Sequence, residues 1–291
     1  MRKTFAAALG LIALTAPLSA QTPAPPPAPT ASARELFGRA ATAAPLAARA
    51  IGTYIRGCLS GAVALPVDGK TWQVMRLSRN RNWGHPRLVQ FLERFAARVP
   101  AIAGWAGILV GDLAQPRGGP MLTGHLSHQI GLDADIWLSP MPARTLTPAE
   151  REEMSAINAV AEDWNDIDPK VWTPAHVRVI KAAAEDPLVE RVLVNPAIKK
   201  ALCRDAGTDR AWLRKVRPWY GHNWHMHIRI GCPPGSTECK PQDAVPPGDG
   251  CGIELAWWFR PEALKPRPVG PQRVMKLSEL PATCTKVLVA P

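Results

Sequence analysis

The stretch "HNWHMHIRI", residues 222–230, holds three of the seven histidines of a 291-residue chain. From His225 onward polar and apolar side chains alternate. Because successive side chains of a β-strand point to opposite faces, this alternation predicts a strand whose apolar face packs on a core. The other face would direct His225 and His227 toward one cavity. The competing interpretation is a half-exposed strand that carries two surface histidines.

A second segment, "GHLSHQIGLDADIWL" at residues 124–138, has the same alternation in its second half. There Asp133 and Asp135 share one side of a predicted strand. Carboxylates beside an apolar strand are unfavourable in a core unless they are paired or coordinated. His125 and His128, just before the strand, have a spacing that suits one face of a turn. We therefore expect both polar faces to meet at one site.

Such a collection of side chains suits a zinc ion. A catalytic zinc usually keeps three protein ligands, drawn from imidazole nitrogens and carboxylate oxygens, and one open position for water. Zinc lowers the pKa of that water to roughly 7, and a neighbouring histidine that is not a ligand can transfer protons. The two segments offer more candidates than zinc needs, which favours a hydrolase over a structural zinc site. The sequence has no HExxH pattern, so helix-based metallopeptidases of that kind are excluded.

The ends of the chain indicate export. Residues 1–20 carry Arg2 and Lys3, an apolar run and small residues, which is the pattern of a cleavable signal peptide. Residues 21–34 read as a Pro/Ala-rich tether, and residues 35–291 as one folded domain. No segment is long and apolar enough to span a membrane. The net charge of +11 favours an anionic polymer as partner, while export argues against nucleic acid.

The remaining patterns predict an α+β domain with a small, largely antiparallel sheet, surrounding helices and long loops. Helices are expected at 86–99, 147–161 and 173–186, and strands at 72–77, 107–113, 191–195 and 225–230. His85 is expected to be structural and His176 to be solvent-exposed. Six cysteines in an exported chain predict three disulfides, with fifteen possible pairings.

The histidine segments resemble the penicillin-insensitive murein endopeptidases, zinc peptidases related to lysostaphin and to the D-alanyl-D-alanine metallopeptidases. The shared features are an H-x-x-x-x-x-x-D pattern, a distant H-x-H pattern, and stretches such as "VNPAIK", "CRDAGTDRAWLRKVRPW", "QVMR" and "GDGCG". The resemblance runs from about residue 51 to residue 284. Many separated stretches match, which makes the resemblance specific.

The resemblance implies a role for each candidate residue. One zinc ion would be held by His128, Asp135 and His227. His225 would be the catalytic base, while His222 and His125 would serve the substrate side of the active site. Asp133 lies on the ligand face and is expected to orient a ligand imidazole. The cysteine pairs implied by the resemblance are Cys58–Cys284, Cys203–Cys251 and Cys232–Cys239.

The implied activity is that of a periplasmic zinc endopeptidase that hydrolyses D-alanyl–meso-diaminopimelate crosslinks of peptidoglycan. Without an acylated serine, β-lactams should not inhibit it. Two alternatives remain at this point: a D-alanyl-D-alanine carboxypeptidase, and a non-catalytic, zinc-stabilised cell-wall binding module. The sequence also leaves open whether the chain forms a homo-oligomer.

Overall fold

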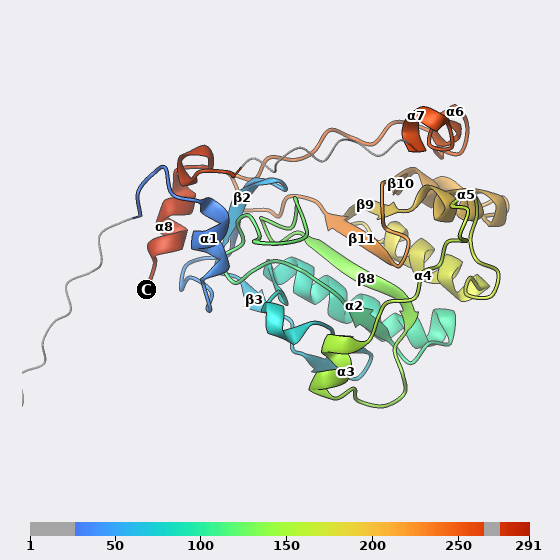
Figure 1. The fold of residues 1–291 in the computed structure, drawn as a ribbon, viewed down its shortest axis with the longest axis horizontal. Coiled ribbons are helices and arrows are strands. Elements are labelled where there is room, and N and C mark those ends of the chain that lie inside the picture. The colour runs from blue at the N-terminus through green and yellow to red at the C-terminus, as the bar shows by residue number, and fades with distance from the viewer. Residues whose placement is uncertain (1–26, 265–273) are drawn as a thin grey trace, which may run out of the picture.

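The computed structural model describes residues 27–264 and 274–291 (Figure 1). The predicted signal peptide and the tether up to residue 26 lie outside the described residues. Among the residues described, no helix combines the length and apolar character that a membrane crossing requires.

A mixed sheet forms the centre of the described chain, in the order β10-β9-β11-β8-β7-β5-β4. Its strands are β4 (Asp68–Gly69), β5 (Trp72–Val74), β7 (Ile108–Val110), β8 (Asp133–Pro140), β9 (Val189–Val194), β10 (Val216–Pro218) and β11 (His225–Ile230). Only the β10–β9 and β5–β7 pairs are parallel. The predicted α+β class with a largely antiparallel sheet is confirmed.

Strands β8 and β11 are antiparallel neighbours, so the two histidine-bearing segments lie side by side. Their register places His227 opposite Asp135 and Arg229 opposite Asp133. Residues directly opposite each other in an antiparallel pair share a face of the sheet. The polar side chains of both strands therefore point to the same side. Their apolar partners on the other side, such as Ile228, are fully buried in the main core.

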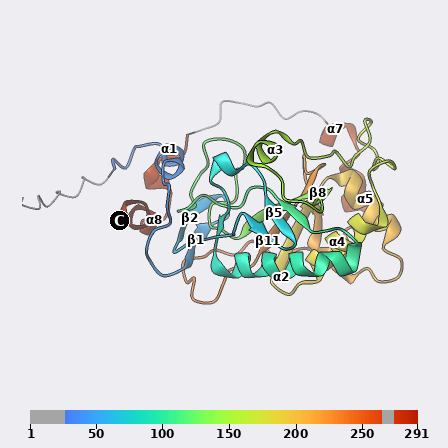
Figure 2. The ribbon, with the colours of Figure 1, turned by 90° about the horizontal axis from the view of Figure 1, so that it is seen from below.

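Helices α2 (Pro86–Ala103) and α4 (Pro174–Glu185) contribute to that core and lie along one side of the sheet, as Figure 2 shows for α2. Helix α2 begins after His85, whose side chain accepts a hydrogen bond from the backbone of Arg87, and ends at Gly104 with a φ of 73°. Glycine adopts this left-handed conformation without the steric cost of a Cβ. The expected structural role of His85 agrees with this capping contact.

Helix α3 (Pro148–Glu153) is much shorter than the helix predicted for 147–161. It begins with a capping box: Thr147 Oγ1 accepts from the backbone of Glu150, and the Glu150 carboxylate accepts from the backbone of Thr147. The helix ends early because Arg76 donates to the backbone carbonyl of Met154, and the following residues run along a cavity instead.

The prediction that His176 is solvent-exposed is wrong, because its side chain is only 3% exposed. Its Nδ1 accepts a hydrogen bond from the backbone of Thr173, and its Nε2 lies 3.0 Å from the carbonyl oxygen of Leu138. The ring also stacks on Trp172. In a capping box this position usually holds Glu or Gln, whose side chain accepts a hydrogen bond from the backbone of the N-cap residue. In α4 the imidazole of His176 accepts this hydrogen bond instead.

Three disulfides link Cys58 to Cys284, Cys203 to Cys251 and Cys232 to Cys239, the pairs that the resemblance implies. The first joins the hairpin of β1 (Arg49–Thr53) and β2 (Arg56–Ser60) to α8 (Thr283–Val289). Helix α1 (Ala33–Gly38) packs on the same small core at the left of Figure 1. It begins two residues before the predicted domain boundary, and that boundary stays a prediction.

The other elements are β3 (Val63–Ala64), β6 (Trp83–Gly84), α5 (Pro196–Asp205), α6 (Ile253–Trp257), α7 (Pro261–Leu264), and 3-10 helices at Leu77–Arg79, Ala211–Lys215 and Leu277–Glu279.

Candidate active site

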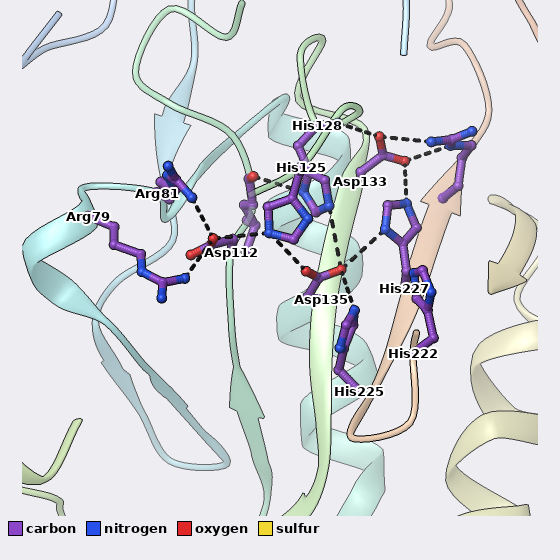
Figure 3. A network of polar contacts seen from close by, with 12 residues as sticks. Arg79, Arg81, Asp112, His125, His128, Asp133, Asp135, His222, His225 and His227 are labelled. Carbon is purple, nitrogen blue, oxygen red and sulfur yellow. Dashed lines mark hydrogen bonds and ion pairs between the residues drawn. The ribbon is translucent and has the colours of Figure 1, made fainter. Parts of the chain in front are cut away.

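Four imidazoles surround the carboxylate of Asp135 on the polar face of β8 and β11 (Figure 3). Asp135 Oδ1 lies 3.2 Å from His227 Nδ1, 3.5 Å from His128 Nε2 and 3.6 Å from His225 Nε2. Its other oxygen, Oδ2, lies 3.4 Å from His125 Nε2. Four of the predicted histidines, two from each segment, are therefore brought to one carboxylate.

The loop before β8 holds His128 in an unusual conformation, with a φ of 66°. Residues other than glycine adopt this region infrequently, and at an energetic cost that their surroundings offset. Here the His128 backbone N–H donates to Asp133 Oδ2 at 2.9 Å, and its ring Nδ1 donates to the carbonyl of Leu113 at 2.9 Å. Because Nδ1 carries the proton, Nε2 presents a lone pair toward Asp135.

Whether a cation fits the site depends on what this lone pair faces. His128 Nε2 and Asp135 Oδ1 are both buried, and neither has a hydrogen-bond partner within the described part of the chain. Two buried acceptors that face each other without a donor are costly, because both have lost water. A metal ion satisfies both at once, and imidazole with carboxylate is a donor set that zinc accepts. The residues present thus fit a metal ion.

Asp133 supports the cluster from behind. The imidazole of His227 donates from Nε2 to Asp133 Oδ1 at 3.0 Å, which turns Nδ1 toward Asp135. Arg229 donates to both oxygens of Asp133, at 2.7 and 3.2 Å. Burial alone would raise the pKa of Asp133, but the charges of Arg229 and His227 hold it well below its usual range. The carboxylate therefore stays ionised and keeps the ring of His227 in place, as carboxylates behind metal-binding imidazoles do.

His125 is held by a further carboxylate, Asp112, that was not among the predicted site residues. His125 Nε2 donates to Asp112 Oδ2 at 3.1 Å, and Arg79 and Arg81 donate to the same oxygen. Although burial would raise the pKa of Asp112, the hydrogen bond with His125 and the charge of Arg81 lower it to about 2. The signal in the sequence was an acidic residue directly after the apolar segment "GILVG".

Two residues are candidates for a third ligand beside His128 and Asp135. One is His125, and the three ligand atoms of that set lie within 4.8 Å of one another. The other is His227. His227 is more deeply buried than His125, and its second nitrogen is already hydrogen-bonded to a carboxylate, which is the usual setting of a metal-binding imidazole.

The other two histidines of the segment lie beside this group. Burial, opposed in part by the charge of Asp135, lowers the pKa of His225 to about 4. Burial and the charge of His225 lower the pKa of His222 to about 3. His222 donates from Nδ1 to the carbonyl of Tyr220 at 2.8 Å. Both rings are therefore neutral at neutral pH.

A cavity of about 300 Å³ opens onto this group. It is lined by Arg76, Arg79, Gly111, Asp112, His125, Asp135, Trp137, Ser155, Ala156 and Trp224. Trp137 and Trp224 meet edge to face, with ring centroids 6.4 Å apart. Trp219 is 52% exposed and instead lies beside Tyr220 and Trp258. The cavity joins an apolar wall, a cationic edge and the candidate metal centre.

An α+β chain with a buried histidine–carboxylate cluster at the edge of a cavity has the features of a hydrolase with a candidate metal centre. The family of penicillin-insensitive murein endopeptidases matches residues 50–289, and this chain belongs to that family. The resemblance noted from the motifs is confirmed.

Proteins described as penicillin-insensitive murein endopeptidases are similar to this chain over most of its length. The protein of Haemophilus influenzae is 46% identical over 246 residues, covering 83% of this chain and 82% of its own. That of Klebsiella pneumoniae is 46% identical over 242 residues, covering 83% and 86%. That of Escherichia coli O1:K1 is 42% identical over 288 residues, covering 99% and 98%.

Proposed function

We propose that this protein is a zinc-dependent endopeptidase of the periplasm that hydrolyses D-alanyl–meso-diaminopimelate crosslinks in peptidoglycan. Family membership supports action on murein. Metal binding is supported by the facing pair of buried acceptors, His128 Nε2 and Asp135 Oδ1, with His227 Nδ1 beside them. These three residues would hold one zinc ion, whose Lewis acidity makes water a nucleophile at neutral pH.

His225 is the proposed general base. Its ring is neutral at neutral pH, and its Nε2 is the nitrogen that faces the ligand group, 3.6 Å from Asp135 Oδ1. At this atom His225 takes the proton of the attacking water and returns it to the leaving amine. His222 and His125 lie on either side of the group and are proposed to contact the substrate. Asp133 keeps His227 oriented throughout.

Direct attack by water forms no acyl-enzyme, so this mechanism predicts insensitivity to β-lactams. The net charge of +11 suits approach to an anionic cell wall. Periplasmic location rests on the predicted signal peptide and on the nature of the substrate.

The decisive experiment combines a metal assay with product analysis. Mature protein with a measured zinc content is incubated with defined crosslinked muropeptide dimers, with and without a chelator. We expect dimers to become monomers, the chelator to stop the reaction, and added zinc to restore it. Release of free D-alanine without monomers would favour the carboxypeptidase, and binding without any product would favour the binding module. Zinc-loaded protein that leaves every dimer intact refutes the proposal.

A further inference from the structure

We propose that Arg79 binds the free carboxylate of the substrate residue that follows the scissile bond, within the cavity that Trp137 and Trp224 help to form. This inference rests on the proposed function, because that function defines which bond is cleaved. Arg79 would thereby determine substrate specificity from a cavity next to the candidate metal centre.

The arginines near this cavity differ in how many of their guanidinium N–H donors remain available to a ligand. Arg81 is buried and uses both terminal nitrogens, on Asp112 and on Thr123. Arg76 donates to the backbone carbonyls of Arg151 and Met154 and lies over the ring of Trp137. Its guanidinium therefore supports the cavity wall.

Arg79 differs from both. Its side chain is 46% exposed, and its one hydrogen bond to the described residues runs from Nη1 to Asp112 Oδ2, at 3.0 Å. A guanidinium has five N–H donors in a planar fork that matches a carboxylate. Arg79 thus keeps donors for a ligand on the lining of the cavity. The contact with Asp112 fixes where those donors lie.

The ion pairs that Asp112 makes leave a positive excess in direct contact, with the Glu152 carboxylate as a further electrostatic neighbour of Arg79. The Asp112 carboxylate is shared by Arg79 and Arg81, so one negative charge faces two permanent positive charges. Figure 3 shows the two arginines on one side of Asp112 and His125 on the other. A second carboxylate, brought by a ligand, would balance the pair. This is the electrostatic setting in which arginine binds carboxylates.

The position of Arg79 also suits a group close to the bond that is cleaved. Contacts of 3.0, 3.1 and 3.4 Å lead from Arg79 through Asp112 and His125 to Asp135. In a D-alanyl–meso-diaminopimelate amide, the carbon attached to the amide nitrogen also carries a free carboxylate. A substrate whose scissile carbonyl lies at the candidate metal centre therefore brings that carboxylate into the same cavity.

A second cavity of about 400 Å³ offers the alternative location. It borders His125 and contains Arg34 and Arg56, but its lining includes neither Asp135 nor either of the two tryptophans. A carboxylate one carbon away from the scissile nitrogen must lie close to the catalytic group. The geometry therefore favours the cavity of Arg79, and the cavity of Arg56 provides the matched control.

The test uses two synthetic crosslinked peptides that differ only at this position, one with the carboxylate and one with the carboxamide. For wild-type protein we expect kcat/KM to favour the acid by roughly 10- to 100-fold, the value of a charge-assisted hydrogen bond. Arg79→Gln should lose that factor on the acid and change the amide by less than about threefold. Arg79→Lys should restore part of the preference, and Arg56→Gln should keep the wild-type preference.

Three outcomes overturn the inference: a wild-type enzyme that does not distinguish acid from amide, an Arg79→Gln enzyme that loses both activities equally, and a preference that disappears in Arg56→Gln. Melting temperature and zinc content of each variant show whether a loss reflects folding. Failure of the proposed function is a different result, because the zinc-loaded wild-type protein would then cleave neither peptide.

Discussion

His128 Nε2 and Asp135 Oδ1 lie 3.5 Å apart, both buried and both without a hydrogen-bond donor among the residues that the structure describes. Two buried acceptors this close together predict that a bound divalent cation stabilises the folded protein. Added zinc should raise the melting temperature of chelator-treated protein, because ligands that bind only the folded state stabilise it. Differential scanning fluorimetry at increasing zinc concentration measures this. Asp135→Ala should show no zinc-dependent shift, and a full shift in that variant would contradict the assignment.

Replacing His225 should separate catalysis from metal binding. His225→Gln removes the proposed base and leaves His128, Asp135 and His227 in place. We expect kcat to fall by roughly 10²- to 10⁴-fold, the usual contribution of a general base. Zinc content should stay near one ion per chain, as determined by elemental analysis. A variant that loses zinc together with activity would assign His225 to the metal instead.

Removing Arg229 should destabilise the protein and weaken the metal site. Arg229→Met leaves Asp133 buried with His227 as its remaining charged neighbour. Loss of one partner of a buried ion pair costs about 3–5 kcal/mol of unfolding free energy. Urea unfolding measures this change, and competition with a chromophoric chelator measures zinc affinity.

The matched variant is Asp133→Asn, which removes the charge but keeps the shape of the side chain. It should lower zinc affinity by about 10- to 100-fold through the loss of ligand orientation. Unchanged zinc affinity in both variants would show that His227 does not depend on Asp133 for its orientation.

Lys199 should make stability depend on pH. Its side chain is fully buried, and its Nζ donates to the carbonyls of Leu213 and Asp249. Burial, with the charge of Arg217, lowers its pKa from 10.5 to about 7. Between these values the unfolded chain holds a proton that the folded chain has released. The unfolding free energy should therefore rise with pH across this window, by up to about 1.4 kcal/mol per pH unit.

Urea unfolding at several pH values between 7 and 9.5 checks the Lys199 prediction. Lys199→Met removes the titrating group at similar side-chain length, so its unfolding free energy should vary less with pH than that of the wild type. Equal slopes for the two proteins would show that another group controls the pH dependence.

Local patterns were sufficient for the strand at residues 225–230 and for the start of each predicted helix. Alternation assigns His227 and Ile228 to opposite faces without knowledge of the partner strand. The capping box of Thr147 and Glu150 is equally local. The end of that helix is not local, because a guanidinium from Arg76, more than seventy positions earlier, binds its last carbonyls. His176 was misjudged for a related reason, since the carbonyl of Leu138, its distant partner, becomes a neighbour only on folding.

What the sequence by itself determined is the set of chemical groups and the face on which each strand carries them, because side-chain direction follows from backbone periodicity. Only the tertiary structure decided which atoms meet. The β8–β11 register places His227 against Asp135, and the carbonyl of Leu113 sets the tautomer of His128. Asp112 enters the site from a different strand end. Contacts of this kind join residues far apart in the chain, and no local pattern encodes their distances.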